Sequence, residues 1–277
     1  MSQQIGAIHY NFPNFSFEQF AEFIGKQGGN RVEVAIRDVW DEKENGALDE
    51  STFAAASAQA EKLRDVLAAN GVQASALSAV NDFVQTDPAV IKTQVARMEL
   101  VGRLAKIFGP HTVLRSEGGQ PKDIPQEKWL DGMYECFMNC TDFCEKLEID
   151  LAIDNHGVVS NDAELLLNLL RKINHPRIGT NLDTMNYRWY GYSVHDCKEI
   201  YKNMAPFAKH THIKDGFDSR ENYKGAALGE GEIDLIYALQ CLREVGYKGA
   251  YLAEYEGKEL EDGVGYAKCI AWLKQNV

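Results

Sequence analysis

Four side chains of types that bind metal ions each follow a strand-like run in the C-terminal half of the chain. They recur at intervals close to or above the roughly 30 residues that one strand and its helix occupy. The carboxyl ends of parallel strands in a closed barrel meet at one mouth, so groups remote in sequence can surround a single ion. Carboxylates with one imidazole suit Mn²⁺, Mg²⁺, Co²⁺ or Zn²⁺. The four predicted metal ligands are Asp154 in LAIDNHG, Asp183 in IGTNLDT, His212 in THIKD and Glu254 in YLAEYEG.

Each of these carboxylates has an ordinary alternative as a helix cap or a salt-bridge partner. Their shared position after apolar runs favours a metal, because a buried carboxylate is costly unless a cation compensates its charge. His210 lies two residues before His212, on the same face of the strand and one pleat deeper. We therefore expect His210 to support a ligand or pack in the core.

Strand-like and helix-like runs alternate along the whole chain, which indicates how the ligands are positioned. Amphipathic stripes with a helical period separate the strand candidates, as in Phe17, Phe20 and Ile24. Strict alternation predicts a parallel sheet, and eight units predict an α/β fold with a single (β/α)8 TIM barrel over residues 1–277. The expected strands are residues 5–10, 31–36, 72–80, 111–117, 150–156, 177–184, 208–215 and 249–256.

Capping residues support the predicted starts of two helices. Ser16 with Gln19, and Asn161 with Glu164, have the spacing of capping boxes at helix starts. No G-x-G-x-x-G motif follows the first expected strand and no Walker A loop is present, which argues against a dinucleotide or ATP fold.

Composition restricts the class of partner. A chain of 277 residues with 45% hydrophobic and 25% charged residues can bury the core of one barrel. The net charge of -12 argues against nucleic acid as a partner, and a small neutral substrate is easier to accommodate. No apolar run reaches the roughly 20 residues of a membrane span, and the N-terminal sequence lacks a signal-peptide pattern. We expect a cytoplasmic protein without a membrane partner.

Three of the six cysteines recur every four residues and form one helical stripe: Cys136, Cys140 and Cys144. Free cysteine commonly packs as a small apolar residue, whereas zinc or cluster sites usually show C-x-x-C spacing. We therefore predict that these three thiols pack in the core, and that the scattered Cys197, Cys241 and Cys269 are reduced thiols.

The motifs DNHG, LDTMN, HIKD, GEGEID and YLAEYEG resemble those of the sugar-phosphate isomerase/epimerase superfamily, which has a xylose-isomerase-like barrel. This superfamily includes ketose 3-epimerases and enzymes of inositol catabolism. The resemblance is strongest over residues 151–257 and implies one divalent ion, most often Mn²⁺, on Asp154, Asp183, His212 and Glu254. It also implies an isomerase or epimerase that works through an enediolate. The acidic residues and the lack of a phosphate-binding glycine loop favour an unphosphorylated keto sugar or polyol as its substrate.

Two positions depart from the epimerase pattern. Asp154 stands where the epimerases usually carry a glutamate, and its side chain is one methylene shorter, which limits its reach as a base. Asn186 stands where many epimerases carry a histidine that binds substrate. His156 lies two residues beyond Asp154 and suits acid/base work, although it could equally fix a loop. The expected catalytic residues are therefore Glu254, His156 and Asp154.

These departures leave a second enzymatic hypothesis open. Some barrels of this superfamily are lyases that enolise a 3-keto C- or O-glycoside and expel the group on its anomeric carbon, as C-glycoside deglycosidases do with a second subunit. The expected assembly is thus a homo-oligomer, or a hetero-oligomer for a deglycosidase. A non-catalytic sugar-binding subunit is a third alternative. An endonuclease IV type of enzyme fits poorly, because it needs more histidines and a basic surface.

Substrate contacts are expected from polar and aromatic residues near the predicted mouth. The run NYRWYGY offers Tyr187, Trp189, Tyr190 and Tyr192 as a stacking wall, or as loop packing or an oligomer interface. Glu33 could bind a hydroxyl or form an ion pair, and the GEGEID turn is expected to position the next helix. The predicted substrate-binding residues are Asn186, Trp189, Lys214, Arg115 and Glu117.

Overall fold

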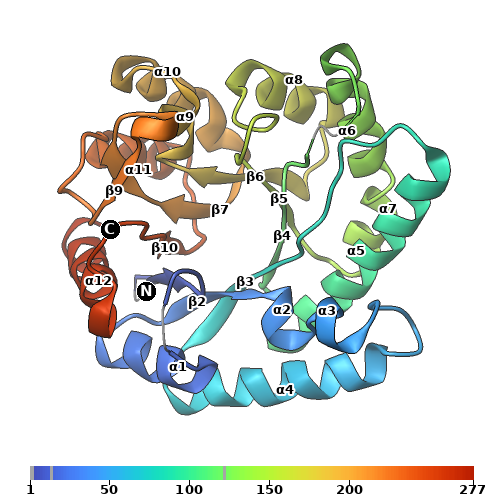
Figure 1. Cartoon of the computed structure of the whole chain (residues 1–277), viewed down its shortest axis with the longest axis horizontal. Coiled ribbons are helices and arrows are strands. Elements are labelled where there is room, and N and C mark those ends of the chain that lie inside the picture. Colours follow the sequence, from blue (N-terminus) through green and yellow to red (C-terminus); the bar gives the residue numbers. More distant parts are fainter. Residues whose placement is uncertain (1–2, 13–14, 121–122) are drawn as a thin grey trace.

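Eight parallel strands close into a barrel surrounded by helices in this computed structural model (Figure 1). The structure describes residues 3–12, 15–120 and 123–277. The strand order is β1-β10-β7-β6-β5-β4-β3-β2, and β2 pairs with β1 to close the ring. The fold is therefore the (β/α)8 TIM barrel that the sequence predicts. The barrel strands are β1 Ile5–Ile8, β2 Arg31–Ala35, β3 Gln73–Ser78, β4 Val113–Ser116, β5 Leu151–Asp154, β6 Ile178–Asp183, β7 Ala208–Ile213 and β10 Tyr251–Ala253.

Every expected strand contains a barrel strand, but the hydrogen-bonded ladders are shorter than the apolar runs. The run 150–156, for example, narrows to β5, because Asn155 and the residues after it leave the sheet. The Asn155 side chain accepts a hydrogen bond from the backbone N–H of Asp183 instead. The ends of the predicted runs therefore supply the walls of the mouth.

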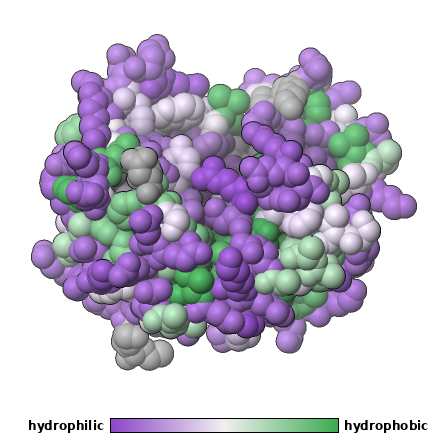
Figure 2. All heavy atoms as spheres, turned by 60° about the horizontal axis from the view of Figure 1, so that its bottom comes forward, coloured by the Kyte–Doolittle hydropathy of each residue, from purple (hydrophilic) through white to green (hydrophobic). Residues whose placement is uncertain are grey.

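The helices cover the outside of the barrel and pack apolar side chains against it (Figure 1). Among the described residues, no helix is long and apolar enough to cross a membrane. Figure 2 shows a face on which hydrophilic residues predominate, with hydrophobic residues in small separate patches. The α-helices are α1 Phe17–Lys26, α2 Ile36–Val39, α3 Glu42–Asn45, α4 Phe53–Ala69, α5 Pro88–Phe108, α6 Trp129–Met138, α7 Thr141–Lys146, α8 Ala163–Ile173, α9 Asn186–Tyr190, α10 Val194–Met204, α11 Leu235–Glu244 and α12 Val264–Asn276.

One of the two predicted capping boxes is confirmed. Ser16 accepts a hydrogen bond from the Gln19 amide while the Gln19 side chain accepts from the Ser16 amide, as expected at the start of α1. The second prediction is wrong by one residue, because Asp162 caps α8. Asn161 is drawn into the loop after β5 instead, where its side chain donates to the carbonyl of Gly157.

The core packing predicted for Cys136, Cys140 and Cys144 is confirmed. All six cysteines are free and buried, and none belongs to a potential metal-binding group of the described residues. Burial raises the pKa of the Cys136 and Cys144 thiols to about 12. These side chains act as small apolar core residues.

A two-stranded antiparallel sheet after β7, not expected from the sequence, consists of β8 Asp215–Phe217 and β9 Lys224–Ala226. The Asp215 carboxylate accepts hydrogen bonds from the backbone amides of Gly229, Gly231 and Ile233. A Cβ atom on Gly231 would lie 2.1 Å from Asp215 Oδ1, so the turn requires glycine there. The GEGEID turn ends at Asp234, the N-cap of α11, and so positions this helix as predicted.

Candidate metal centre

Three of the four predicted ligands converge at the carboxyl ends of adjacent strands. Asp183 ends β6, His212 lies in β7, and Glu254 directly follows β10. His212 Nδ1 is 3.0 Å from Glu254 Oε2 and 4.0 Å from Asp183 Oδ2. All three side chains are buried, and one candidate ligand atom from each lies within 4.8 Å of the others. This cluster is the candidate metal centre.

Two atoms of this centre lack a hydrogen-bond partner among the described residues. The Asp183 Oδ1 atom accepts from the backbone amides of Met185 and Asn186, whereas its Oδ2 atom accepts from none. The Nδ1 atom of His212 makes no well-aligned hydrogen bond either, although it forms an ion pair with Glu254 Oε2 at 3.0 Å. Buried polar atoms without partners are rare, and a bound cation would satisfy both. Burial raises the pKa of Asp183 to about 8, against the opposing effect of Lys214.

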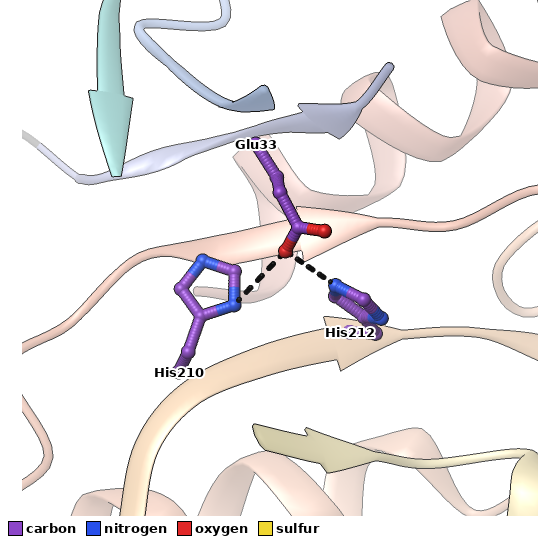
Figure 3. A group of neighbouring side chains, drawn as sticks. All are labelled: Glu33, His210 and His212. Atoms are coloured by element: carbon purple, nitrogen blue, oxygen red, sulfur yellow. Dashed lines mark hydrogen bonds and ion pairs between the residues drawn. The ribbon is translucent and has the colours of Figure 1, made fainter. Parts of the chain in front are cut away.

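Glu33 of β2 holds the imidazole of His212 from the other side. Its Oε2 atom is 2.9 Å from His212 Nε2 and 3.6 Å from His210 Nδ1, as Figure 3 shows. Burial alone would raise the pKa of Glu33, but Arg115 and His212 outweigh it and lower the value to about 2. An ionised carboxylate on Nε2 leaves Nδ1 directed to the candidate centre, which is the usual support of a metal-binding histidine.

Arg115 of β4 binds three carboxylates at once. Its Nε donates to Glu33 Oε1 at 2.7 Å, Nη1 to Asp154 Oδ2 at 2.8 Å and Nη2 to Glu117 Oε1 at 3.1 Å. The side chain is buried, and these carboxylates hold the pKa of its guanidinium well above the usual value despite the burial. Arg115 and Glu117 were expected to contact substrate; the structure gives them ion-pair partners within the protein.

Asp154 lies beside the cluster of three, and both of its carboxylate oxygens have donors. Besides Arg115, the Asn181 side-chain amide donates to Asp154 Oδ1 at 2.6 Å. Asp154 forms a potential metal-binding group with Glu117 and His156, and this group contains none of the other predicted ligands. His156 is exposed, and its backbone amide donates to Ser160 Oγ, which fixes the loop after β5.

Lys214 connects the candidate centre to the rim. Its ammonium group is 3.1 Å from Glu254 Oε1 and 2.9 Å from Glu256 Oε2, and it donates to Asn186 Oδ1 at 3.4 Å. Burial would lower the pKa of Lys214, but Glu254 and Asp183 outweigh it, so the group stays charged. Lys214 and Asn186, which were both predicted to bind substrate, therefore contact each other beside the cluster.

A cavity of about 260 Å³ opens at this mouth of the barrel. A larger cavity of about 910 Å³ lies at the opposite end, but none of the three clustered ligands lines it. We therefore place the chemistry at the smaller cavity, which also agrees with the usual location of TIM-barrel sites. Its lining consists of Ile8, His9, Tyr10, Glu33, Ala35, Arg37, Ser78, Val80, Arg115, Glu117, Asp154, His156, His212, Glu254 and Glu256.

Residues 24–276 match the xylose isomerase-like TIM barrel family. The chain belongs to this family. The resemblance of its motifs to the sugar-phosphate isomerase/epimerase superfamily is thereby confirmed. An uncharacterized protein of Methanocaldococcus jannaschii is 25% identical over 140 residues. That match spans 49% of this chain and 46% of the relative, so the chain spans about half the length of the curated relative it matches.

Solved structures of similar shape have low sequence identity and support the fold alone. A structure of the IolI protein with a bound zinc atom has a TM-score of 0.75 at 16% identity, covering 99% of this chain and 96% of that one. The 3-keto-D-glucoside 4-epimerase YcjR of E. coli, in its apo form, has a TM-score of 0.74 at 10% identity, covering 99% of this chain and 100% of that one.

The aromatic run after Asp183 does not line the cavity. Trp189 is absent from the cavity lining, and the Arg220 guanidinium lies 5.4 Å from its ring centroid. Tyr187 is fully buried, and the Tyr192 hydroxyl accepts from the Ala163 amide. Loop packing, one of the three alternatives for this run, accounts for these contacts.

A histidine on the cavity wall that pairs with a carboxylate was missed from the sequence. His9 directly follows β1, and its Nδ1 is 2.8 Å from Asp38 Oδ2. The ring stacks on Phe20 with centroids 4.6 Å apart. In the barrel order β1 lies opposite β5, so His9 and His156 follow strands on opposite sides of the mouth, and both residues line the cavity. The only signal was a histidine ending the AIHY run, because its partner lies 29 residues away in α2.

Proposed function

We propose that this protein is a divalent-metal-dependent isomerase or epimerase of an unphosphorylated keto sugar or polyol, and that it works through an enediolate. The single observation that carries the proposal is the pair of unsatisfied atoms, Asp183 Oδ2 and His212 Nδ1, beside Glu254. Family membership supports a sugar-modifying enzyme. The IolI structure with zinc supports a divalent ion, and we propose Mn²⁺ here.

The charge around the cavity also favours a cation and an uncharged substrate. Carboxylates outnumber the buried basic side chains, so the described residues leave excess negative charge that a divalent ion would offset. A phosphorylated sugar would meet repulsion in the same place. The acidic groups are Glu33, Glu117, Asp154, Asp183, Glu254 and Glu256, and the basic groups are Arg115, Lys214 and His212, whose pKa Glu33 and Glu254 raise well above its usual value despite burial.

Asp183, His212 and Glu254 would hold the ion, which supplies a Lewis acid that polarises the substrate carbonyl. Lys214 and His212 outweigh burial and keep the pKa of Glu254 well below its usual range, so this carboxylate is ionised and can accept a proton from the carbon beside the carbonyl. His156 at the rim supplies the second proton-transfer group. Lys214 neutralises Glu254 and orients it by hydrogen bonding.

A test begins with metal analysis of the purified protein. D-fructose and a 3-keto-D-glucoside are then incubated in deuterated water with and without Mn²⁺. We expect metal-dependent deuterium on the carbon next to the carbonyl, and loss of both metal affinity and turnover in Glu254→Gln. Full activity of a metal-free preparation contradicts the proposal. Direct movement of a carbon-bound label between adjacent carbons points instead to a hydride shift.

Elimination from a 3-keto C- or O-glycoside is the second candidate. The hydrogen bonds to both carboxylate oxygens of Asp154 favour it. With both oxygens of Asp154 held by Arg115 and Asn181, one free carboxylate and His156 remain as base and acid. Elimination needs this combination, whereas epimerisation needs a base on each face. Release of the aglycone from the 3-keto-D-glucoside separates the two reactions. Sugar binding without any turnover indicates a non-catalytic subunit.

A further inference from the structure

The four predicted ligands divide into two groups by their hydrogen bonding. Asp183 Oδ2 and His212 Nδ1 are buried and make no hydrogen bond with the described residues, although Glu254 Oε2 lies 3.0 Å from His212 Nδ1. In contrast, each oxygen of Asp154 receives a short hydrogen bond, from Arg115 at 2.8 Å and from Asn181 at 2.6 Å. Asp154 therefore has its charge and its acceptor atoms satisfied without an ion, and Asp183 does not.

The partners of Asp154 are themselves fixed. The Arg115 guanidinium is also bound by Glu33 and Glu117. The oxygen of the Asn181 side chain lies 3.0 Å from His210 Nδ1, and His210 Nε2 lies 3.2 Å from Ser75 Oγ. Movement of Asp154 toward the cluster would separate a buried ion pair and leave the Asn181 amide without its acceptor, both of which are costly in a buried site.

We infer that this chain holds its divalent ion through three side chains, Asp183, His212 and Glu254, while Arg115 and Asn181 keep Asp154 outside the coordination sphere. The inference rests on the metal dependence of the proposed function. One coordination position that a fourth carboxylate would fill is then left to water or to a substrate oxygen. Asp154, at the end of β5, would then belong to a separate acidic group with Glu117 and His156 on the substrate side of the ion.

Metal binding alone tests this inference, without a substrate. Mn²⁺ affinity is measured by calorimetry and the visible spectrum of bound Co²⁺ by absorption, for the wild type, Asp154→Asn and Asp183→Asn. The two variants are matched, because each replaces a buried carboxyl group with an amide of nearly the same shape. Asp154→Asn should weaken Mn²⁺ binding by less than about tenfold, below even the usual range for partners of metal ligands. Asp183→Asn should weaken it by more than about a hundredfold and change the Co²⁺ spectrum.

Asp154→Glu tests whether a longer carboxylate at this position becomes a fourth metal ligand. The added methylene lets the carboxylate reach beyond its contacts with Arg115 and Asn181, so it can supply a fourth ligand. We expect Mn²⁺ affinity to increase. The Co²⁺ absorption should weaken, as it does when coordination number rises. Circular dichroism of each variant shows whether the fold is retained.

The outcomes separate this inference from the proposed function. If Asp154→Asn weakens Mn²⁺ binding as much as Asp183→Asn, or changes the Co²⁺ spectrum in the same way, Asp154 is a ligand. The inference is then overturned, while the metal-dependent function stands. If the wild type binds neither ion, the metal-dependent function and the inference fall together. An Asp154→Glu protein with unchanged affinity and spectrum also contradicts the inference.

Discussion

Glu33 Oε2 lies 2.9 Å from His212 Nε2, although the two residues are 179 positions apart in the chain. The contact directs the opposite ring nitrogen to Asp183 and Glu254. Glu33→Gln keeps the shape of the side chain and removes its charge. We expect Mn²⁺ affinity to fall by about 10- to 100-fold, the usual effect of losing such a partner. Calorimetry measures it, and Glu117→Gln, which contacts Arg115 but not His212, should change the affinity much less.

His156→Ala is expected to preserve metal content and lower turnover by about 10²- to 10⁴-fold, because a positioned proton-transfer group contributes this much. Metal analysis and steady-state kinetics on the same preparation provide the two measurements. A parallel fall of metal affinity and activity would instead assign His156 to holding the loop after β5. Unchanged activity would remove it from the site.

His9 is expected to react with diethyl pyrocarbonate faster than His175. The two side chains are matched in exposure, at 14% and 16%, and each is paired with a carboxylate. His175 has both ring nitrogens engaged, by Glu145 and by the Arg177 amide. His9 Nε2 has no hydrogen bond to the described residues, so its lone pair is open to the cavity when Nδ1–H donates to Asp38.

Peptide mass spectrometry gives the rate for each histidine separately. His9→Gln should also lower turnover if this imidazole moves a proton of a substrate hydroxyl. Equal reaction rates of His9 and His175 would show that another group occupies the Nε2 atom of His9.

Arg115→Met should destabilise the fold by about 3–5 kcal/mol, because it leaves Glu33 and Asp154 buried without their counter-charge. Urea denaturation monitored by circular dichroism measures the free energy of unfolding. The control is Lys146→Met, which breaks a surface pair with Glu99 and should cost less than about 1 kcal/mol. Equal effects of the two substitutions would mean that water or counter-ions already screen the Arg115 site.

Ellman's reagent at pH 8 is expected to titrate no cysteine in the native protein and all six in guanidinium chloride. A raised pKa keeps a thiol neutral at any pH below it, and a thiol with a pKa of about 12 is ionised in only about one molecule in ten thousand at pH 8. Rapid reaction of any thiol in the native state would locate a local opening of the fold. The pKa values raised to about 12 belong to Cys136, Cys144, Cys197 and Cys269.

The barrel could be predicted because its signals are local. Each apolar run and each amphipathic stripe spans a few residues, and alternation of the two types specifies a parallel sheet. The order of strands then brings Asp183, His212 and Glu254 together without further information. The shift of the second cap to Asp162 shows the limit of such signals, since Asn161 has a competing partner in the loop after β5.

The arrangement around Asp154 could not be predicted, because it depends on side chains from three strands. Arg115 comes from β4 and Asn181 from β6, and neither lies near Asp154 in the sequence. An arginine at a strand end is equally compatible with binding substrate or with an internal ion pair. Only the packed barrel decides between them, through the positions of Glu33 and Glu117.

The four backbone amides on Asp215 have a consequence for binding affinity. Its carboxylate accepts from Gly216, Gly229, Gly231 and Ile233, so β8 and the GEGEID turn are held together directly after Lys214. The backbone that follows Lys214 is therefore ordered before any ligand binds. Holding Lys214 in place then costs little conformational entropy on binding, and more of the contact energy remains as affinity.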